Sequence, residues 1–225
     1  MCISDRSIPA SCKITLLNPY VKNQLIIMLK EPRAGRVKTR LGKDIGMVPA
    51  AWWFRHQSRR LLRELEDPRW SITLAISPDK AAFVKHIWPA ELRRIPQGQG
   101  DLGQRMRRQF VNAPRGPVCI IGADVPDISK THVQTAFKTL ASHDWVFGPA
   151  ADGGYWLIGA KRISAFAPRV FQNVRWSTRH ALADTIKTLP DARVALIDTL
   201  RDVDTLSDLK KFNRHRHIPK GHDAS

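Results

Sequence analysis

Val118-Cys119-Ile120-Ile121-Gly122-Ala123-Asp124-Val125-Pro126-Asp127 is the stretch of this 225-residue sequence that says most about its architecture. The apolar run predicts a buried strand, and a turn with two aspartates follows it directly. A carboxylate at the end of a buried strand is costly unless a cation compensates its charge, and Mg²⁺ takes one or two carboxylates together with phosphate oxygens. Asp124 is therefore a candidate metal ligand, although Asp124 or Asp127 could instead cap the turn into the next helix.

Short apolar runs alternate with longer amphipathic stretches along the rest of the chain, which is typical of βαβ units and predicts an α/β fold with a parallel sheet. The expected strands are residues 25–29, 71–76, 92–95, 118–121, 145–147, 155–158 and 194–197. The expected helices are residues 50–65, 79–87, 102–111, 129–140, 177–189 and 205–212, with Ser129 and Ser177 as N-caps. In such a sheet the ligand binds at the carboxyl ends of the strands, so the loops that follow strands are where chemistry is expected.

Composition sets limits on the class of protein. With 43% hydrophobic and 25% charged residues the chain is globular, and we expect one domain over residues 23–213, an N-terminal extension over 1–22 and a basic tail over 214–225. The longest apolar run, residues 25–29, is too short for a membrane span of roughly 20 residues or a signal-peptide core of about 7, which predicts a cytoplasmic protein. Three cysteines without C-x-x-C spacing predict neither disulfides nor a zinc site. The net charge of +17 favours anionic partners such as nucleotides, phosphorylated metabolites, nucleic acid or acidic lipid.

A basic loop follows the first expected strand, and a turn rich in glycine and glutamine follows the third. The basic loop holds five cations with a proline and a glycine, so it could wrap a diphosphate or be a solvated turn; its candidate phosphate ligands are Lys30, Arg33, Gly35, Lys38 and Arg40. Val37 stands where a Walker A motif needs glycine, which excludes that motif. The second loop is a flexible turn or a site for the edge of a nucleotide base, with Gln97, Gly100 and Asp101 as candidates.

Two further acidic loops complete the candidate site. The turn at 152–156 is a plain hairpin or an acceptor site in which Asp152 acts as base, beside Gly153, Gly154, Tyr155 and Trp156. Asp204 follows the last expected strand and is either a helix N-cap or a second Mg²⁺ ligand that clamps the ion together with Asp124.

Five motifs in this order carry a family resemblance. They are K-x-P-x-x-G-x-x-K-T-R-L at 30–41, Q-G-x-G-D-L-G-x-R-M at 97–106, I-G-x-D-x-P at 121–126, G-P-x-x-D-G-G-Y-W-L-I-G at 148–159 and D-V-D-T-x-x-D-L at 202–209. The chain resembles, over about residues 24–212, an uncharacterised family of GT-A-type nucleotide-diphospho-sugar transferases associated with radical-SAM and selenium-related genes. That family is related to the MobA-like and phospholactate guanylyltransferase nucleotidyltransferases.

The resemblance implies a three-layer α/β/α Rossmann-like fold, a nucleotide or nucleotide-sugar donor, a small acceptor and a divalent ion, Mg²⁺ or Mn²⁺. Lys38 and Arg40 match the phosphate-binding pair of the relatives, Gln97 and Gly100 the base-reading positions, and Asp124 and Asp204 the metal positions. Because Ala123 and Val125 flank Asp124, the D-x-D pattern of many glycosyltransferases is absent there.

The resulting hypothesis is a Mg²⁺-dependent glycosyltransferase in which Lys38 neutralises the leaving phosphate and Asp152 is the base. The alternative within the family is a nucleotidyltransferase that releases pyrophosphate. The alternative from another class is a nucleic-acid-binding module, motivated by the net charge and by the basic residues of one expected helix, Arg55, His56, Arg59, Arg60 and Arg63. The acidic loops argue against nucleic acid, because they would repel a polyanion.

Overall fold

The computed structural model describes residues 22–84, 86–162 and 166–217. The expected extension over 1–22 therefore lies outside the described residues except for residue 22, as does the end of the expected tail. Residues 214–217 of that tail belong to the last helix. Within the described ranges, no helix combines the length and the apolar character that crossing a bilayer demands.

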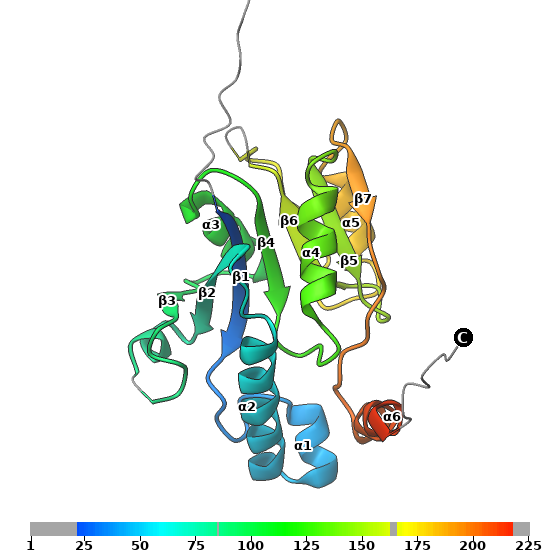
Figure 1. Ribbon diagram of the computed structural model, residues 1–225. Coiled ribbons are helices and arrows are strands. Elements are labelled where there is room, and N and C mark those ends of the chain that lie inside the picture. The colour runs from blue at the N-terminus through cyan, green and yellow to red at the C-terminus, as the bar shows by residue number, and fades with distance from the viewer. Residues whose placement is uncertain (1–21, 85, 163–165, 218–225) are drawn as a thin grey trace, which may run out of the picture.

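A seven-stranded mixed sheet forms the middle of the molecule (Figure 1). Its strands are β1 (Asn23–Lys30), β2 (Trp70–Ser77), β3 (Arg93–Pro96), β4 (Val118–Gly122), β5 (Trp145–Pro149), β6 (Tyr155–Ala160) and β7 (Val194–Leu196). They lie in the order β3-β2-β1-β4-β6-β5-β7, and β6 pairs antiparallel with both of its neighbours while every other pair is parallel. Every expected strand is present, and the predicted mostly parallel sheet is confirmed.

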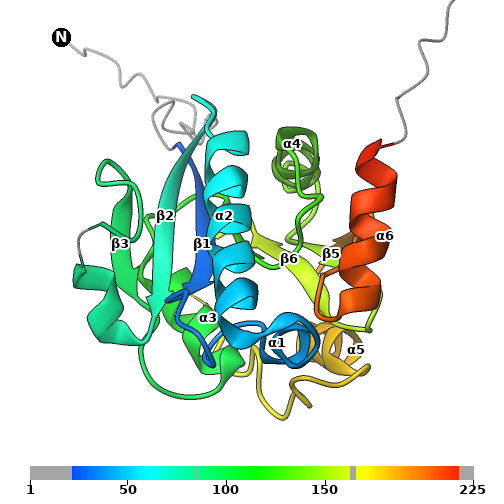
Figure 2. The same cartoon turned by 90° about the horizontal axis from the view of Figure 1, so that it is seen from below.

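Helices cover both faces of this sheet, which confirms the three-layer α/β/α architecture (Figure 2). The helices are α1 (Thr39–Ile45), α2 (Met47–Glu64), α3 (Leu102–Asn112), α4 (Lys130–Thr139), α5 (Ala181–Lys187) and α6 (Leu206–His217). Apolar side chains of α2 and α4 pack on one face, for example Phe54 and Phe137, and those of α3 pack on the other, for example Phe110. Leu25, Ile27 and Leu29 of β1 are buried in the first core and Ile26 in the second, as the alternation of side chains along a strand requires.

Two local expectations differ from the structure, and one is confirmed. The segment expected to be helical over 79–87 is a short 3₁₀ helix, η1 (Asp79–Phe83), and His86 with φ of 79° is incompatible with a continuing helix. Ser129 caps α4 as expected, since its hydroxyl accepts from the His132 amide. Ser177 does not cap α5, because its φ is 59° and the helix starts after His180.

The segment after β7 carries the chain back across the carboxyl ends of the strands. The Leu200 amide donates to the Pro149 carbonyl and the Ala151 amide donates to the Leu200 carbonyl, both at 3.1 Å. Beyond this point the Val203 amide donates to the Asp124 carbonyl at 3.3 Å. The last part of the chain is thereby tied to the loop that follows β4.

Candidate active site at the carboxyl ends of the strands

A cleft of about 680 Å³ opens at the carboxyl ends of β1 and β4. Sequence-predicted residues that line it are Lys30, Lys38, Arg40, Gln97, Gly100, Asp101, Asp124, Asp204, Tyr155 and Trp156. Arg33, Gly35, Asp152, Gly153 and Gly154 lie outside its lining. The cleft therefore lies where ligands are expected to bind in open α/β sheets, at the carboxyl ends of the strands.

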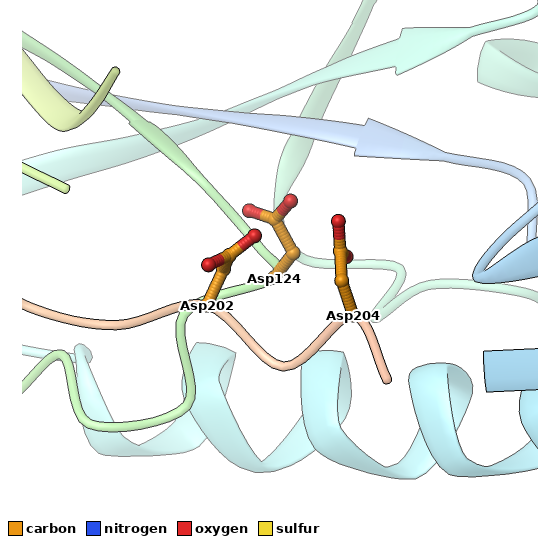
Figure 3. Close-up of side chains that lie close together, drawn as sticks. All are labelled: Asp124, Asp202 and Asp204. Carbon is orange, nitrogen blue, oxygen red and sulfur yellow. The ribbon is translucent and has the colours of Figure 1, made fainter. Parts of the chain in front are cut away.

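Three carboxylates meet beside this cleft (Figure 3): those of Asp124 and Asp204, which line it, and that of Asp202, which lies outside its lining. One oxygen of each lies within 4.8 Å of the others. Asp124 comes from the loop after β4, and the other two come from the segment between β7 and α6. Residues about eighty positions apart in the chain thus form one acidic triplet, which is the name we use for these three side chains.

The backbone explains why the triplet converges. Val203 is buried and bonded to the Asp124 carbonyl, so the residues on either side of it, Asp202 and Asp204, both lie beside Asp124. Asp204 is not needed as a helix cap, because Thr205 fills that role: its hydroxyl accepts from the Asp208 amide, and the Asp208 carboxylate accepts from the Thr205 amide. Gly122 leaves room for Asp124, since a Cβ there would lie 2.7 Å from the Asp124 Oδ1.

The three carboxylates of the triplet carry like charges at close range, and this affects the pKa of Asp202. Burial, and after it the neighbouring Asp204, Asp124 and Asp152 charges, together raise the pKa of the Asp202 carboxyl to about 6. The Lys38 ammonium opposes this effect: its Nζ lies 2.7 Å from Asp204 Oδ1 and 3.7 Å from Asp124 Oδ2, and its side chain is only 5% exposed. Arg40 adds a longer, exposed contact to Asp204 at 3.5 Å.

These three carboxylates suit a hard divalent cation. Mg²⁺ and Mn²⁺ prefer oxygen ligands, and three carboxylate oxygens within 4.8 Å of one another can share one ion. Lys38 alone does not neutralise the three negative charges. The donor set therefore fits the predicted metal, and it includes Asp202 in addition to the two predicted ligands.

The basic loop divides into residues at the cleft and residues away from it. Lys30, Arg36, Lys38 and Arg40 line the cleft, whereas Arg33 is exposed and pairs with Glu31 at 3.4 Å. Gly35 has a φ of 74° and is exposed, so it shapes the turn. Lys38 is the N-cap of α1 and has a left-handed backbone conformation with a φ of 47°. Helix α1 itself was not among the helices expected from the sequence.

In the loop after β3, the predicted base-reading side chains already have partners within the protein. The Gln97 amide nitrogen donates to the Leu29 and Ala75 carbonyls at 3.0 and 2.8 Å, so of its side-chain amide only the oxygen is left for a base. Asp101 is the N-cap of α3 and forms a capping box with Gln104. Gly100 has a φ of 103°, which favours glycine. Arg105, which we did not single out, lines the cleft from α3.

The Asp-Gly-Gly turn joins β5 to β6 as an antiparallel hairpin. The Asp152 Oδ1 accepts from the Gly154 amide at 2.9 Å, and a Cβ on Gly153 would overlap the Arg179 backbone. Tyr155 and Trp156 pack into the cores on opposite faces of the sheet, because consecutive strand residues point to opposite faces, and both line the cleft. The Tyr155 hydroxyl meets Thr185 at 3.4 Å, and burial raises the pKa of Tyr155 above its usual range; the Trp156 indole donates to the Asp198 carbonyl at 2.9 Å.

Asp202 is the residue that our sequence reading missed. The signal was present as Asp202-Val203-Asp204, in which an apolar residue separates two acids and predicts that both lie on one side of an extended segment.

Two of the basic residues of α2, on which the nucleic-acid alternative was based, form hydrogen bonds within the protein. Arg59 donates to the His86 and Ile87 carbonyls at 3.2 Å, and Arg60 donates to the Pro126 carbonyl at 2.6 Å.

Comparisons with known proteins give the family and the fold of this chain. The family described as "Uncharacterized protein conserved in bacteria (DUF2064)" matches residues 61–178. None of the curated proteins compared with the chain matches it. A crystal structure of a "putative nucleotide-diphospho-sugar transferase" from Desulfovibrio desulfuricans G20 is 29% identical with a TM-score of 0.80, over 90% of this chain and 91% of that one.

Two more distant structures share the fold. The 4-diphosphocytidyl-2C-methyl-D-erythritol synthase of Anaerococcus prevotii DSM 20548 is 11% identical with a TM-score of 0.53, over 87% of this chain and 98% of that one. A CMP:2-keto-3-deoxy-manno-octonic acid synthetase complexed with CTP is 11% identical with a TM-score of 0.52, over the same shares of the two chains. At this identity both show the fold alone, and the chain therefore has the fold of the nucleotide-diphospho-sugar transferases.

Proposed function

Because this chain belongs to the DUF2064 family of uncharacterised bacterial proteins, we propose its function from its site. We propose a metal-dependent glycosyltransferase that moves a sugar from a nucleotide-diphospho-sugar to a small acceptor. The observation that carries the proposal is the acidic triplet with Lys38 beside the cleft. The similarity to the Desulfovibrio structure supports the donor class.

Asp124, Asp202 and Asp204 would hold Mg²⁺ or Mn²⁺. When bound, such an ion supplies positive charge for the diphosphate oxygens and so stabilises the leaving group. The other cleft residues provide fixed charge of the same sign: Lys30, Arg36, Lys38 and Arg40 face the space in which a diphosphate would lie. Cations placed where negative charge develops are an effective way to lower the barrier of such a transfer.

The acceptor step needs a base and a defined proton path. The acceptor hydroxyl oxygen bonds to the anomeric carbon, the bond from that carbon to the diphosphate oxygen breaks with its electron pair, and a nucleoside diphosphate leaves. We assign the acceptor proton to Asp152 Oδ2, because Oδ1 of the same carboxylate is taken by the Gly154 amide. Asp152 lies close enough to the triplet to raise the pKa of Asp202.

A second candidate is nucleotidyl transfer, and the cation content of the cleft favours it. Lys30, Arg36, Lys38, Arg40 and Arg105 together supply more positive charge than a diphosphate alone requires, which suits a triphosphate donor. In that reaction an acceptor phosphate attacks the α-phosphorus and pyrophosphate leaves. The two reactions are distinguished by the product, which is a nucleoside diphosphate in the first and pyrophosphate in the second.

A thermal-shift screen of nucleotides and nucleotide sugars, with and without Mg²⁺ or Mn²⁺, tests the proposal. A ligand at about 100 times its Kd stabilises by about 2.7 kcal/mol, which corresponds to a shift of roughly 5–10 °C in a chain of this size. We expect a nucleotide-sugar shift that requires metal, is lost in Asp124→Asn and persists in Asp127→Asn, an exposed acid of the same loop outside the triplet. Any hit is then incubated with a mixture of small acceptors, and the released nucleoside diphosphate or pyrophosphate is measured.

Either of two results would reject the assignment: a metal-dependent shift that survives Asp124→Asn, or binding of nucleic acid that is indifferent to chelation and weakens steeply with salt.

A further inference from the structure

We propose that Arg60 is a positioning residue that holds the two acid-bearing segments together and thereby sets the metal affinity of the acidic triplet. The inference rests on the metal site of the proposed function. Arg60 lies on α2, and its described contacts include the Pro126 carbonyl and the Phe212 ring. Through these contacts it acts on the backbone and packing of the segments that carry the carboxylates of the triplet.

The first link runs from Arg60 to the loop after β4. The Arg60 Nη2 donates to the Pro126 carbonyl at 2.6 Å, and Pro126 is buried two residues beyond Asp124. A hydrogen bond from a guanidinium to a carbonyl is charge-assisted and short, so it fixes the loop more firmly than a neutral bond does. The Arg60 Nε donates at the same time to Gln57 Oε1 at 3.2 Å, and Gln57 is only 6% exposed, which fixes the plane of the guanidinium.

The second link runs from Arg60 to the helix that follows Asp204. The Arg60 Cζ lies 5.9 Å from the centre of the Phe212 ring, and Phe212 on α6 is buried. Cation–π contact at this distance is attractive and strengthens as water is excluded. α1 lies between the ends of α2 and α6 in both views (Figures 1 and 2), and the Leu206 amide at the start of α6 donates to Asp44 Oδ2 of α1 at 3.2 Å.

These links matter because the triplet repels itself. Three carboxylates at close range push the loop after β4 away from the segment at 202–204, and the direct backbone bond between them, Val203 to Asp124, is long at 3.3 Å. A single side chain that contacts both Pro126 and Phe212 resists this separation. Metal affinity depends on the prior alignment of the ligands, and residues that align ligands typically change affinity by about 10- to 100-fold when mutated.

Arg59 provides a matched control. It is the next residue of the same helix, it is half-buried like Arg60, and it also donates to backbone carbonyls, those of His86 and Ile87 at 3.2 Å. Those carbonyls belong to the connection between β2 and β3, which carries no residue of the triplet. A general effect of losing an α2 arginine would therefore appear in both variants, and a positioning effect only in Arg60.

The experiment measures Mn²⁺ binding by calorimetry to chelator-treated full-length protein, for wild type, Arg60→Met, Arg59→Met, Arg60→Lys and Asp124→Asn. We expect Arg60→Met to weaken Mn²⁺ binding about 10- to 100-fold and Arg59→Met to leave it at the wild-type value. Arg60→Lys should fall between, because a lysine can reach one carbonyl but lacks the planar fork. Urea unfolding of the same proteins without metal checks whether Arg60→Met and Arg59→Met lose comparable stability.

Wild-type affinity in Arg60→Met, or an equal loss in Arg59→Met, overturns the assignment. If Arg60→Met does not fold, Arg60→Lys decides, and unchanged Mn²⁺ affinity in that variant rejects the proposal. Failure of the proposed function looks different: wild type then binds no Mn²⁺, or Asp124→Asn binds it as well as wild type, and the Arg60 proposal falls with it. Binding that requires Asp124 but is indifferent to Arg60 rejects the positioning role alone.

Discussion

The acidic triplet and the Asp184 carboxylate place the same side-chain chemistry in opposite surroundings. Asp184 on α5 accepts from the Arg175 amide at 3.2 Å and from its guanidinium at 2.8 and 2.9 Å, and this arginine holds the pKa of Asp184 well below its usual range. Asp202 lies among other carboxylates, and its pKa is raised to about 6. An aspartate that is fully neutralised from within the chain maintains the fold, whereas three clustered aspartates that, within the described part of the chain, form ion pairs only with Lys38 and Arg40 indicate a cation from outside.

The sharpest way to break this comparison is Asp202→Asn. We expect Mn²⁺ binding to weaken about 100-fold or more, at or beyond the upper end of what ligand-aligning residues cause, since one charged ligand is lost outright. The metal-free protein should become more stable at pH 7, because repulsion between the carboxylates is reduced. The gain should be only roughly 1 kcal/mol, because these carboxylates are half-exposed and water already screens their repulsion. Calorimetry gives the affinity and urea unfolding the stability.

Asp198→Asn is the control for that variant, since Asp198 lies in the same segment, is 69% exposed at its side chain and is outside the triplet. A loss of metal affinity as large in Asp198→Asn as in Asp202→Asn would contradict the distinction between the two regions.

Lys38→Met sharpens the comparison because Lys38 is the buried cation of the triplet. Without nucleotide, we expect Mn²⁺ to bind about tenfold more tightly, since a positive charge 2.7 Å from Asp204 no longer opposes the ion. Nucleotide binding should weaken in the same variant, because the phosphates lose a cation. Lys30→Met, an exposed cleft residue, serves as the control for the first effect. Equal Mn²⁺ affinity in wild type and Lys38→Met would show that Lys38 does not compete with the metal.

Asp184→Asn tests the other side of the comparison through pH. Since the folded-state pKa of Asp184 is lowered, its contribution to stability is present above the ordinary aspartate pKa of about 3.9 and is lost as the pH falls toward the folded-state value. We expect the variant to be less stable than wild type at pH 7 and pH 5, and the difference to shrink below about pH 3.9. Urea unfolding at three pH values measures it. Asp191→Asn removes an exposed ion pair with Arg169 and should change the free energy of unfolding little. An effect as large as that of Asp184→Asn would contradict the special role of Asp184 in stability.

The sheet was predictable because its strands are short apolar runs between turn signals. Both features are visible in the local sequence, without knowledge of which strands become neighbours. Helix α1 was not predictable by the same reasoning. Among its residues only Leu41 and Gly42 are buried, so no helical period of apolar residues exists to be read, and the neighbouring cations indicated a loop instead.

The candidate site was predictable in part. Asp124 and Asp204 follow strands, and the rule for parallel sheets brings them to one edge. The Asp-Val-Asp spacing indicates that Asp202 lies on the same side as Asp204, but that this side faces Asp124 depends on how the chain from β7 is bonded to Pro149, Ala151 and Asp124, which is tertiary information. The engagement of the Gln97 amide with the Leu29 and Ala75 carbonyls likewise depends on strands that are neighbours only after folding.

The segment at 198–204 also has a consequence for biosynthesis. A ribosome makes every strand of the sheet before it makes Asp202 and Asp204, so the acidic triplet is completed only after the whole sheet has been synthesised. A protease that cuts between β7 and residue 202 would likewise separate Asp202 and Asp204 from the part of the chain that carries Asp124, without removing a strand.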